Sequence, residues 1–367
     1  MSIYLDANAT MPIRPEVIET MSSIMAETGN ASSIHGLGRK ARAHVEKARD
    51  TLASVLNTKS TQIVFNAGAT ESLNTVLKHF NAGKILVSAT EHPAGFEPLK
   101  EPHTIPVHAN GVIDLDALEE QIKTVQPELI SVMLVNNETG VIQPIKEMVS
   151  LAHANGVLVH SDASQALGRI VIDVEDLGVD YMSFSAHKCG GPQGVGALYF
   201  KPTLNVPKMI YGGGQEKSYR AGTENVAGIA GFGIAAELAL THMDAFQDLG
   251  KFRDKIEEYL HKNNPGVKIW GNDTLRVSNT SCFTLAGVPA STLLMNFDMA
   301  GICVSSGSAC SSGKVKGSKV LHAMGAKQAE IESAIRISLS WQTTAKDIDL
   351  FLEEWEKIYA RVKHKVS

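Results

Sequence analysis

The stretch Val157-Leu158-Val159-His160-Ser161-Asp162, together with the later stretch Tyr181-Met182-Ser183-Phe184-Ser185-Ala186-His187-Lys188, decides the fold. Each begins as a short apolar run and ends in polar or charged residues. Short apolar runs between polar segments are typical of buried strands. The sequence predicts six such strands, at residues 62–66, 84–88, 129–135, 157–161, 181–185 and 195–200.

Helical patterns fill the gaps between several of these strands. The clearest is the segment 38–57, where apolar residues recur every three or four positions, at Ala41, Val45, Ala48, Leu52 and Val55. Further helices are predicted at residues 72–80, 116–124 and 145–155. Alternating strands and helices imply an α/β fold with a largely parallel sheet covered on both faces. Since ligands bind beyond the carboxyl ends of such strands, we expect functional residues just after them.

The pattern changes after a Gly- and Ala-rich helix predicted at residues 226–240. A helix at 252–260, strands at 278–285 and 334–340, and a charged amphipathic helix at 345–362 follow. A chain of 367 residues suits about two domains or one large enzyme-like unit. We therefore predict a domain boundary near residue 245.

Composition argues against several classes of protein. Lys and Arg total 34 and Asp and Glu total 39, giving a net charge of −5, which disfavours nucleic-acid binding through phosphate neutralisation. The most apolar stretch, residues 226–236, is too short to span a bilayer, so no membrane association is expected. The first residues carry no basic or apolar signal region, so the expected location is the cytoplasm. Four cysteines in 367 residues are too few for a disulfide framework, and none of them form a Cys-x-x-Cys pair, so no metal site is expected either.

Lys188 directly follows a predicted buried strand. A lone lysine there is ordinarily a surface residue in a polar turn, whereas a Schiff-base lysine needs a desolvated site and a cofactor held by neighbouring groups. Candidate neighbours follow other strands: Asp162 either pairs with a protonated pyridine nitrogen or caps a helix. The turn before Thr70 opens a helix and is either a phosphate site or an ordinary capped turn. His92 either stacks on a planar ring or is a loop histidine.

Several motifs, taken together and in order along the chain, resemble the cysteine desulfurases. They are Ser-Phe-Ser-Ala-His-Lys ending at Lys188, Gly-Ala-Thr-Glu-Ser around Thr70, Thr-Glu-His ending at His92, Val-Asn-Asn-Glu-Thr-Gly around Asn137, and Ser-Ser-Gly-Ser-Ala-Cys ending at Cys310. Cysteine desulfurases are pyridoxal-phosphate-dependent, class V aminotransferase-like enzymes of iron–sulfur cluster assembly. The resemblance runs from residues 5–10 to residues 336–339, nearly the whole chain.

The resemblance implies an aspartate-aminotransferase-like fold and a set of site residues. The large domain, residues 16–245, would hold a mainly parallel seven-stranded sheet. The small α+β domain, residues 246–367, would carry a mobile cysteine loop at 305–318, and residues 1–15 would form an arm packed on the small domain. The resemblance also implies the contacts of the cofactor. Lys188 would bind pyridoxal 5'-phosphate covalently, and His92 would stack on its ring and move protons. Asp162 would pair with the ring nitrogen, Gln165 would pair with the ring hydroxyl, and Asn137 would lie beside cofactor and substrate. The phosphate would be held by Ala69, Thr70, Ser185 and His187.

The remaining implied roles concern substrate, partner subunit and sulfur. Arg336 would bind the substrate carboxylate, with Asn30 and Asn137 also holding substrate. Thr223 would reach the phosphate in the partner subunit of a homodimer. Lys188 would remove the α-proton of L-cysteine, and the Cys310 thiolate would attack its sulfur. The products would be L-alanine and a persulfide on Cys310, whose sulfur passes to an acceptor protein such as an iron–sulfur scaffold.

The chain departs from the family pattern at a few positions. Ala31, Gly190 and Gln193 stand where the family commonly has other residues, although no implied catalytic residue is missing. Two other readings stay open. One is another enzyme of the same fold, a selenocysteine lyase or an aminotransferase, which would not need Cys310. The other is a non-catalytic scaffold that binds pyridoxal phosphate or only keeps the fold. Of the other cysteines, Cys282 and Cys303 are expected in the core.

Overall fold

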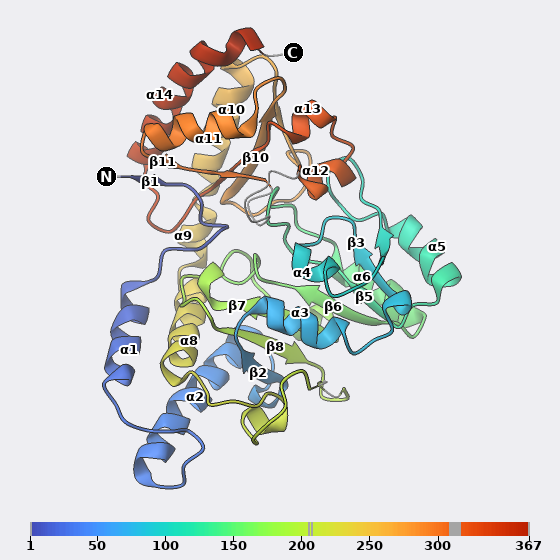
Figure 1. Cartoon of the computed structure of the whole chain (residues 1–367), viewed down its shortest axis with the longest axis vertical. Coiled ribbons are helices and arrows are strands. Elements are labelled where there is room, and N and C mark those ends of the chain that lie inside the picture. The colour runs from blue at the N-terminus through green and yellow to red at the C-terminus, as the bar shows by residue number, and fades with distance from the viewer. Residues whose placement is uncertain (1, 205, 207, 308–316, 366–367) are drawn as a thin grey trace.

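The computed structural model describes residues 2–204, 206, 208–307 and 317–365. A seven-stranded sheet forms its larger part, as expected (Figure 1). All neighbouring strands run parallel except where β8 pairs antiparallel with β2 and β7. In spatial order the strands are β2 (Ile63–Asn66), β8 (Gly196–Phe200), β7 (Tyr181–Ser185), β6 (Leu158–Asp162), β5 (Leu129–Ser131), β3 (Ile85–Ser88) and β4 (His103–Ile105).

Both faces of this sheet are buried because alternate residues of each strand join different cores. In β3, Leu86 belongs to one core while Ile85 and Val87 belong to another, as the two-residue period of a strand requires. The first core is closed by helices that include α2 (Gly36–Val55), α6 (Ile145–Ala154) and α8 (Val226–Thr241). The second is closed by helices that include α3 (Ala69–Leu77). Further helices of this part are α1 (Pro15–Met25), α4 (Pro93–Phe96), α5 (Leu115–Val125) and α7 (Val174–Leu177).

A four-stranded antiparallel sheet forms the rest of the structure, at the top of Figure 1. Its order is β12 (Ser305–Ser306), β13 (Ile335–Ser338), β10 (Thr280–Leu285) and β9 (Val267–Ile269). Trp355 is fully buried in its core and stacks on Phe297. The surrounding helices are α9 (Met243–Gln247), α10 (Gly250–Asn263), α11 (Ala290–Met299), α12 (Lys319–Ala323), α13 (Gln328–Ile331) and α14 (Ala345–Val362).

The N-terminal segment packs against this four-stranded part. Strand β1 (Ile3–Tyr4) pairs in parallel with β11 (Ile302–Cys303), and Asp6 forms a bridge with Ser338 of β13. Leu5, with its neighbours Ala7 and Met11, lies in the same core as Trp355. The chain then crosses to α1 and the large sheet, as Figure 1 shows. The first residues therefore run between the two parts of the molecule.

The predicted elements differ from the structure in a few places. The predicted strand 129–135 is too long, since β5 ends at Ser131, although the backbone N–H groups of Val132 and Leu134 still donate to carbonyls of β6. The predicted cysteine loop begins too early, because Ser305–Ser306 pair with Ile335 and Arg336. It also ends too late, because Ser318 is buried and caps α12. Residues 308–316 lie outside the described residues.

None of the helices in the described ranges is, by itself, both long and apolar enough to cross a membrane. The bent pair Val226–Thr241 and Met243–Asn263 meets that test by length and composition only.

Candidate active site

A cavity of about 790 Å³ lies where several strand ends of the large sheet meet the four-stranded part and the N-terminal segment. It gathers residues that are far apart in the sequence. The predicted residues that line it are Ala69, Thr70, His92, Asn137, Asp162, Gln165, Ser185, His187, Lys188 and Arg336. The rule that ligands bind beyond the carboxyl ends of parallel strands therefore locates the cavity correctly.

Lys188 ends a short 3-10 turn, Ala186–Lys188, directly after β7. Its Nζ donates to the backbone carbonyl of Asn8 at 2.6 Å and to that of Ala9 at 2.9 Å. The amine thus lies in the cavity, held by the N-terminal segment, and is not a surface group in a polar turn. A lysine amine fixed in this way is positioned for covalent chemistry.

Asp162 is the last residue of β6 and is buried. Its Oδ1 accepts from the backbone N–H of Ser164 at 2.9 Å and from the Ser164 hydroxyl at 2.5 Å. The carboxylate therefore closes a local turn rather than capping a helix, which rules out the ordinary helix-cap interpretation. Both bonds go to Oδ1, so they leave Oδ2 for a further partner.

Two buried side-chain oxygens that belong to cavity-lining residues have no hydrogen-bond partner: Oε1 of Gln165 and Oδ1 of Asn137. The Gln165 amide is held from its other side, since Nε2 donates to the carbonyl of Asn8 at 3.0 Å. Buried polar atoms in proteins are nearly always satisfied. These two acceptors therefore fit a ligand that presents hydroxyl or N–H donors in the cavity.

The first turn of α3 provides an anion site at the cavity wall. Gly68 occupies the N-cap position with φ of 148° and no side-chain cap, so the first N–H groups of the helix keep no side-chain acceptor. A Cβ at Gly196 would lie 2.5 Å from Cα of Gly68, so only glycine permits this close packing of backbone. Thr70 and Ser185 line the same wall. Backbone N–H groups at a helix N-terminus with hydroxyls nearby suit a phosphate group.

Two histidines line the cavity. Burial, together with the positive charge of Lys188, lowers the pKa of His187 to about 4, so its imidazole is neutral at pH 7. His187 Nδ1 also contacts the Thr10 hydroxyl at 3.0 Å. His92 caps α4 by accepting the backbone N–H of Ala94 at its Nδ1, at 3.1 Å. Because Nδ1 is an acceptor there, the neutral His92 ring carries its proton on Nε2.

Glu91 lies beside His92 and is buried. Its Oε1 accepts the backbone N–H of Met133 at 2.5 Å, while its Oε2 has no partner. Burial raises the pKa of Glu91 well above its usual range, and Asp162 adds to that rise. The site therefore holds a carboxyl group that favours its neutral form behind the cavity wall.

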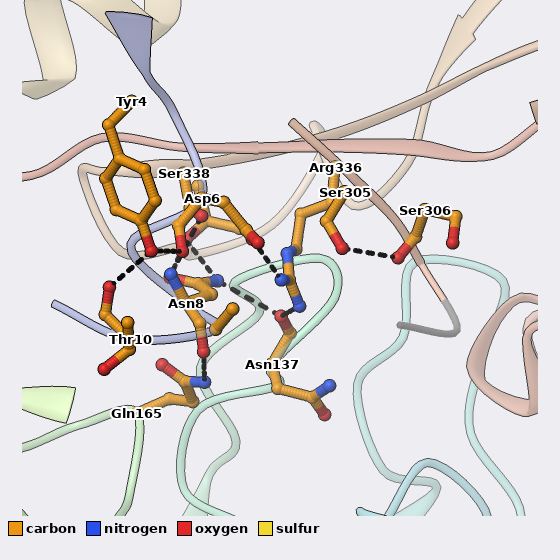
Figure 2. A network of polar contacts seen from close by, with 12 residues as sticks. Tyr4, Asp6, Asn8, Thr10, Asn137, Gln165, Ser305, Ser306, Arg336 and Ser338 are labelled. Carbon is orange, nitrogen blue, oxygen red and sulfur yellow. Dashed lines mark hydrogen bonds and ion pairs between the residues drawn. The ribbon is translucent and has the colours of Figure 1, made fainter. Parts of the chain in front are cut away.

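Arg336 lies on β13 and is 2% exposed. Its Nη2 pairs with Asp6 Oδ1 at 2.7 Å and its Nη1 donates to the backbone carbonyl of Asn137 at 3.0 Å, as Figure 2 shows. Its Nε is buried without a partner. The guanidinium is therefore oriented by two contacts and keeps further N–H donors, Nε–H among them, for a carboxylate.

Comparison with known proteins decides the family. Residues 3–351 match the family described as Aminotransferase class-V. The chain belongs to this family. A cysteine desulfurase, IscS, of Dictyoglomus turgidum is 39% identical to this chain over 98% of it and 95% of the relative. A cysteine desulfurase of Sinorhizobium fredii is also 39% identical, over 95% and 94% of the two chains. The resemblance predicted from the motifs is thus confirmed.

Solved structures of other proteins are similar to this chain over nearly its whole length. A NifS-like protein from Rickettsia africae matches with a TM-score of 0.92 and 38% identity, covering 98% of this chain and all of that one. A structure described as SspA in complex with cysteine matches with a TM-score of 0.81 and 29% identity, over 94% of this chain and all of that one. These matches confirm the expected fold.

Of the predicted site residues that the structure describes, Asn30 and Thr223 do not line the cavity. Asn30 is exposed, and its Oδ1 accepts the backbone N–H of Ser32 at 2.8 Å. Thr223 is also exposed; its predicted contact is with a partner subunit. Cys310 lies outside the described residues.

The other cysteines are placed as follows. Cys282 is fully buried, as expected, whereas Cys303 is half-buried, so its predicted core position is wrong. Burial raises the pKa of Cys189 to about 12, and its thiol donates to the carbonyl of Ala186.

Sequence reasoning gave no role to some residues that build the site. Asn8 and Ala9 line the cavity, and their backbone carbonyls hold Lys188. They lie in residues 5–10, where the resemblance to the family begins, but no role was predicted for them. Glu138, next to Asn137, accepts the Ser318 hydroxyl at its Oε2, at 2.5 Å. A Cβ on Gly307 would meet the same oxygen at 2.5 Å. Since Gly307 and Ser318 flank residues 308–316, Glu138 lies where both ends of that segment meet the fold.

Proposed function

We propose that the protein is a pyridoxal-phosphate-dependent cysteine desulfurase. It removes sulfur from L-cysteine, giving L-alanine and a persulfide on Cys310. The observation that carries the proposal is the meeting of Lys188, Asp162 and Arg336 in one cavity, since these supply an amine, an acid and a carboxylate-binding group. The cysteine desulfurases at 39% identity over nearly the whole chain support it.

The donors and acceptors of the cavity fit pyridoxal 5'-phosphate. The first turn of α3, with Ala69 and Thr70, would hold the phosphate together with Ser185 and His187. Asp162 would hold the protonated ring nitrogen, and the partnerless Oε1 of Gln165 would accept from the ring hydroxyl. The bound cofactor would supply an electron-withdrawing ring that stabilises negative charge at the substrate Cα.

The chain's own residues would then perform four tasks. Lys188 binds the cofactor covalently and afterwards moves the Cα proton at its Nζ. His92, whose Nε2 carries the proton in the neutral ring, stacks against the cofactor and moves a second proton. Arg336 fixes the substrate carboxylate, with Asn137 beside it. The Cys310 thiolate attacks the substrate sulfur, which forms an S–S bond as the carbon–sulfur bond breaks.

Further parts of the proposal concern assembly and sulfur transfer. We place the domain boundary near residue 245, which Phe246 supports by belonging to the core of the four-stranded part. Thr223 reaches the phosphate of the partner site in a homodimer that works in the cytoplasm. The persulfide sulfur passes to an acceptor protein, such as an iron–sulfur scaffold. The SspA structure described as a cysteine complex supports cysteine as the substrate class.

The first test supplies the purified protein with pyridoxal phosphate, L-cysteine and a thiol reductant. We expect sulfide and alanine in equal amounts. The Lys188→Ala variant should lose the yellow colour of the bound cofactor and form neither product. A Lys201→Ala variant, which removes another half-buried lysine held by a backbone carbonyl, should stay yellow with the cofactor and form both products. Amino transfer to a keto acid that persists in Cys310→Ala would instead identify an aminotransferase.

A further inference from the structure

Asn8 connects the catalytic lysine to the large sheet. Its backbone carbonyl accepts both Lys188 Nζ, at 2.6 Å, and Gln165 Nε2, at 3.0 Å. Its side-chain Oδ1 accepts Nη1 of the buried Arg169 at 2.6 Å. Asn8 is itself 1% exposed, so these contacts are shielded from water. One residue therefore holds the lysine amine on one side and a buried guanidinium on the other.

The same residue is tied to Arg336. Asn8 Nδ2 donates to the backbone carbonyl of Asn137 at 3.1 Å, and Arg336 Nη1 donates to that same carbonyl at 3.0 Å (Figure 2). Asn8 is also bonded to the four-stranded part. Its backbone N–H donates to Ser338 Oγ at 2.9 Å, and its Nδ2 donates to Thr280 Oγ1 at 3.0 Å.

These contacts matter because a lysine side chain has a long, flexible stem. Its amine takes a single position only where fixed acceptors select one. Here the acceptors are two backbone carbonyls in the N-terminal segment, which belongs to no helix at that point. Those carbonyls stay in place only if residue 8 does, and the side chain of Asn8 provides the anchors. We infer that Asn8 is a positioning residue that fixes the Lys188 amine relative to the Arg336 guanidinium.

The importance of the distance between the Lys188 amine and the Arg336 guanidinium rests on the proposed function. In that function, Arg336 holds the substrate carboxylate while Lys188 moves the proton at Cα. The two groups must then stand a fixed distance apart, and small displacements of reacting groups lower rates strongly. Asn8 contacts the Lys188 amine through its backbone carbonyl, while its side chain, which the variant removes, touches neither that amine nor the substrate carboxylate in this account. It acts through Lys188 and through the Asn137 carbonyl.

The deciding experiment uses the cofactor-free protein and does not depend on turnover. Native Asn8→Ala and wild-type protein are acylated briefly, and the extent of labelling at each lysine is measured by mass spectrometry. We expect Lys188 to react about fivefold faster in the variant, a factor comparable to the loss of one hydrogen bond. Lys201, whose Nζ donates to the carbonyl of Gly178 at 2.6 Å, is the internal reference and should react at an unchanged rate.

Two controls separate positioning from general loosening of the fold. Gln143→Ala removes another buried amide with two backbone bonds, to Ile113 and Gly111, away from the cavity. It should leave the Lys188 rate unchanged. If Asn8→Ala does not fold, Ser338→Ala removes only the acceptor of the Asn8 backbone N–H and should accelerate Lys188 about twofold, as a partial loss of anchoring would. An unchanged Lys188 rate, or an equal rise at Lys201, overturns the inference.

The loaded enzyme provides the second readout. In Asn8→Ala we expect KM for L-cysteine to rise and kcat to fall together, because the Arg336 guanidinium and the Lys188 amine are both held less firmly. A variant that merely contains less folded protein would lower the apparent kcat without changing KM. An unchanged KM in Asn8→Ala contradicts the link to Arg336. Absence of sulfide from the wild type would refute the proposed function, while the acylation result would still decide the role of Asn8.

Discussion

Asp6 and Arg336 form an ion pair across the two ends of the chain, with Asp6 Oδ1 lying 2.7 Å from Arg336 Nη2. Arg336 is buried, whereas the Asp6 side chain keeps 21% of its exposure. The group proposed to bind the substrate carboxylate therefore already has an anionic partner. The N-terminal segment thus takes part in the charge balance of the site, in addition to packing on the four-stranded core.

The first prediction concerns that pair. In Asp6→Asn the charge of Arg336 is no longer balanced, so it should attract the substrate carboxylate more strongly and lower KM for L-cysteine severalfold. The free energy of unfolding should fall by about 1–3 kcal/mol, because a buried charge loses its ionised partner. Steady-state kinetics and urea denaturation measure the two effects. Asp176→Asn breaks an exposed ion pair with Lys146 and should change neither quantity much. A raised KM in Asp6→Asn would contradict this account of the pair.

The second prediction concerns pH. Burial lowers the pKa of His160 to about 3, and its ring nitrogens contact Ser131 and Ser183 hydroxyls at 2.9 and 2.7 Å. The unfolded chain therefore binds a proton at higher pH than the folded chain. Stability should be fully present above pH ~6.5, the usual pKa of histidine, and should be lost as the pH falls toward the folded value. Urea denaturation between pH 7.5 and 4.5 measures this loss, and His160→Gln should flatten it. A wild-type stability that rises toward acid pH would refute the assignment.

The third prediction concerns the flank of the Cys310 segment. Ser318 donates its hydroxyl to the buried Glu138 carboxylate and accepts the backbone N–H of Leu321 at 3.0 Å. Ser318→Ala removes a partner from a buried carboxylate and also a helix cap, so we expect a loss of about 1–3 kcal/mol in the free energy of unfolding. Ser318→Thr keeps the hydroxyl and should recover most of it. Equal stability of all three proteins would show that the contact contributes nothing.

The fourth prediction concerns cofactor affinity. The side-chain Oδ1 of Asn137 is buried without a partner, so a bound ligand would satisfy it. Asn137→Ala should raise Kd for pyridoxal phosphate about fivefold, the effect of one hydrogen bond. Titration of cofactor-free protein followed by absorbance measures Kd. Asn30→Ala is the control and should leave Kd unchanged, since Asn30 does not line the cavity. Equal Kd for Asn137→Ala and wild type would argue against the contact.

Local patterns predicted much of the fold. Helix α14 has the predicted bounds because its apolar face repeats regularly and Thr344 caps it through a reciprocal contact with Asp347. Strand β7 also has the predicted bounds, since its apolar residues Tyr181, Met182 and Phe184 mark a buried strand. Strand β4 was missed because it is a short edge strand with two of its three residues exposed.

The site was predictable only where its residues follow strands. Asp162 and Lys188 end or follow buried strands, so their place at one sheet edge follows from the topology. Asn8 lines the cavity and Asp6 pairs with the cavity-lining Arg336, and both positions depend on contacts with residues such as Ser338, far away in the sequence. No local pattern encodes such a contact, because it depends on how the N-terminal segment pairs with β11 and β13.

In the proposed reaction, Cys310 receives the sulfur of L-cysteine. Mass spectrometry of the protein, loaded with pyridoxal phosphate and incubated with L-cysteine without reductant, tests it most directly. We predict one added sulfur atom on the peptide that contains Cys310, absent in Lys188→Ala and absent from the half-buried Cys303. Release of alanine with no added sulfur on Cys310 would contradict the account.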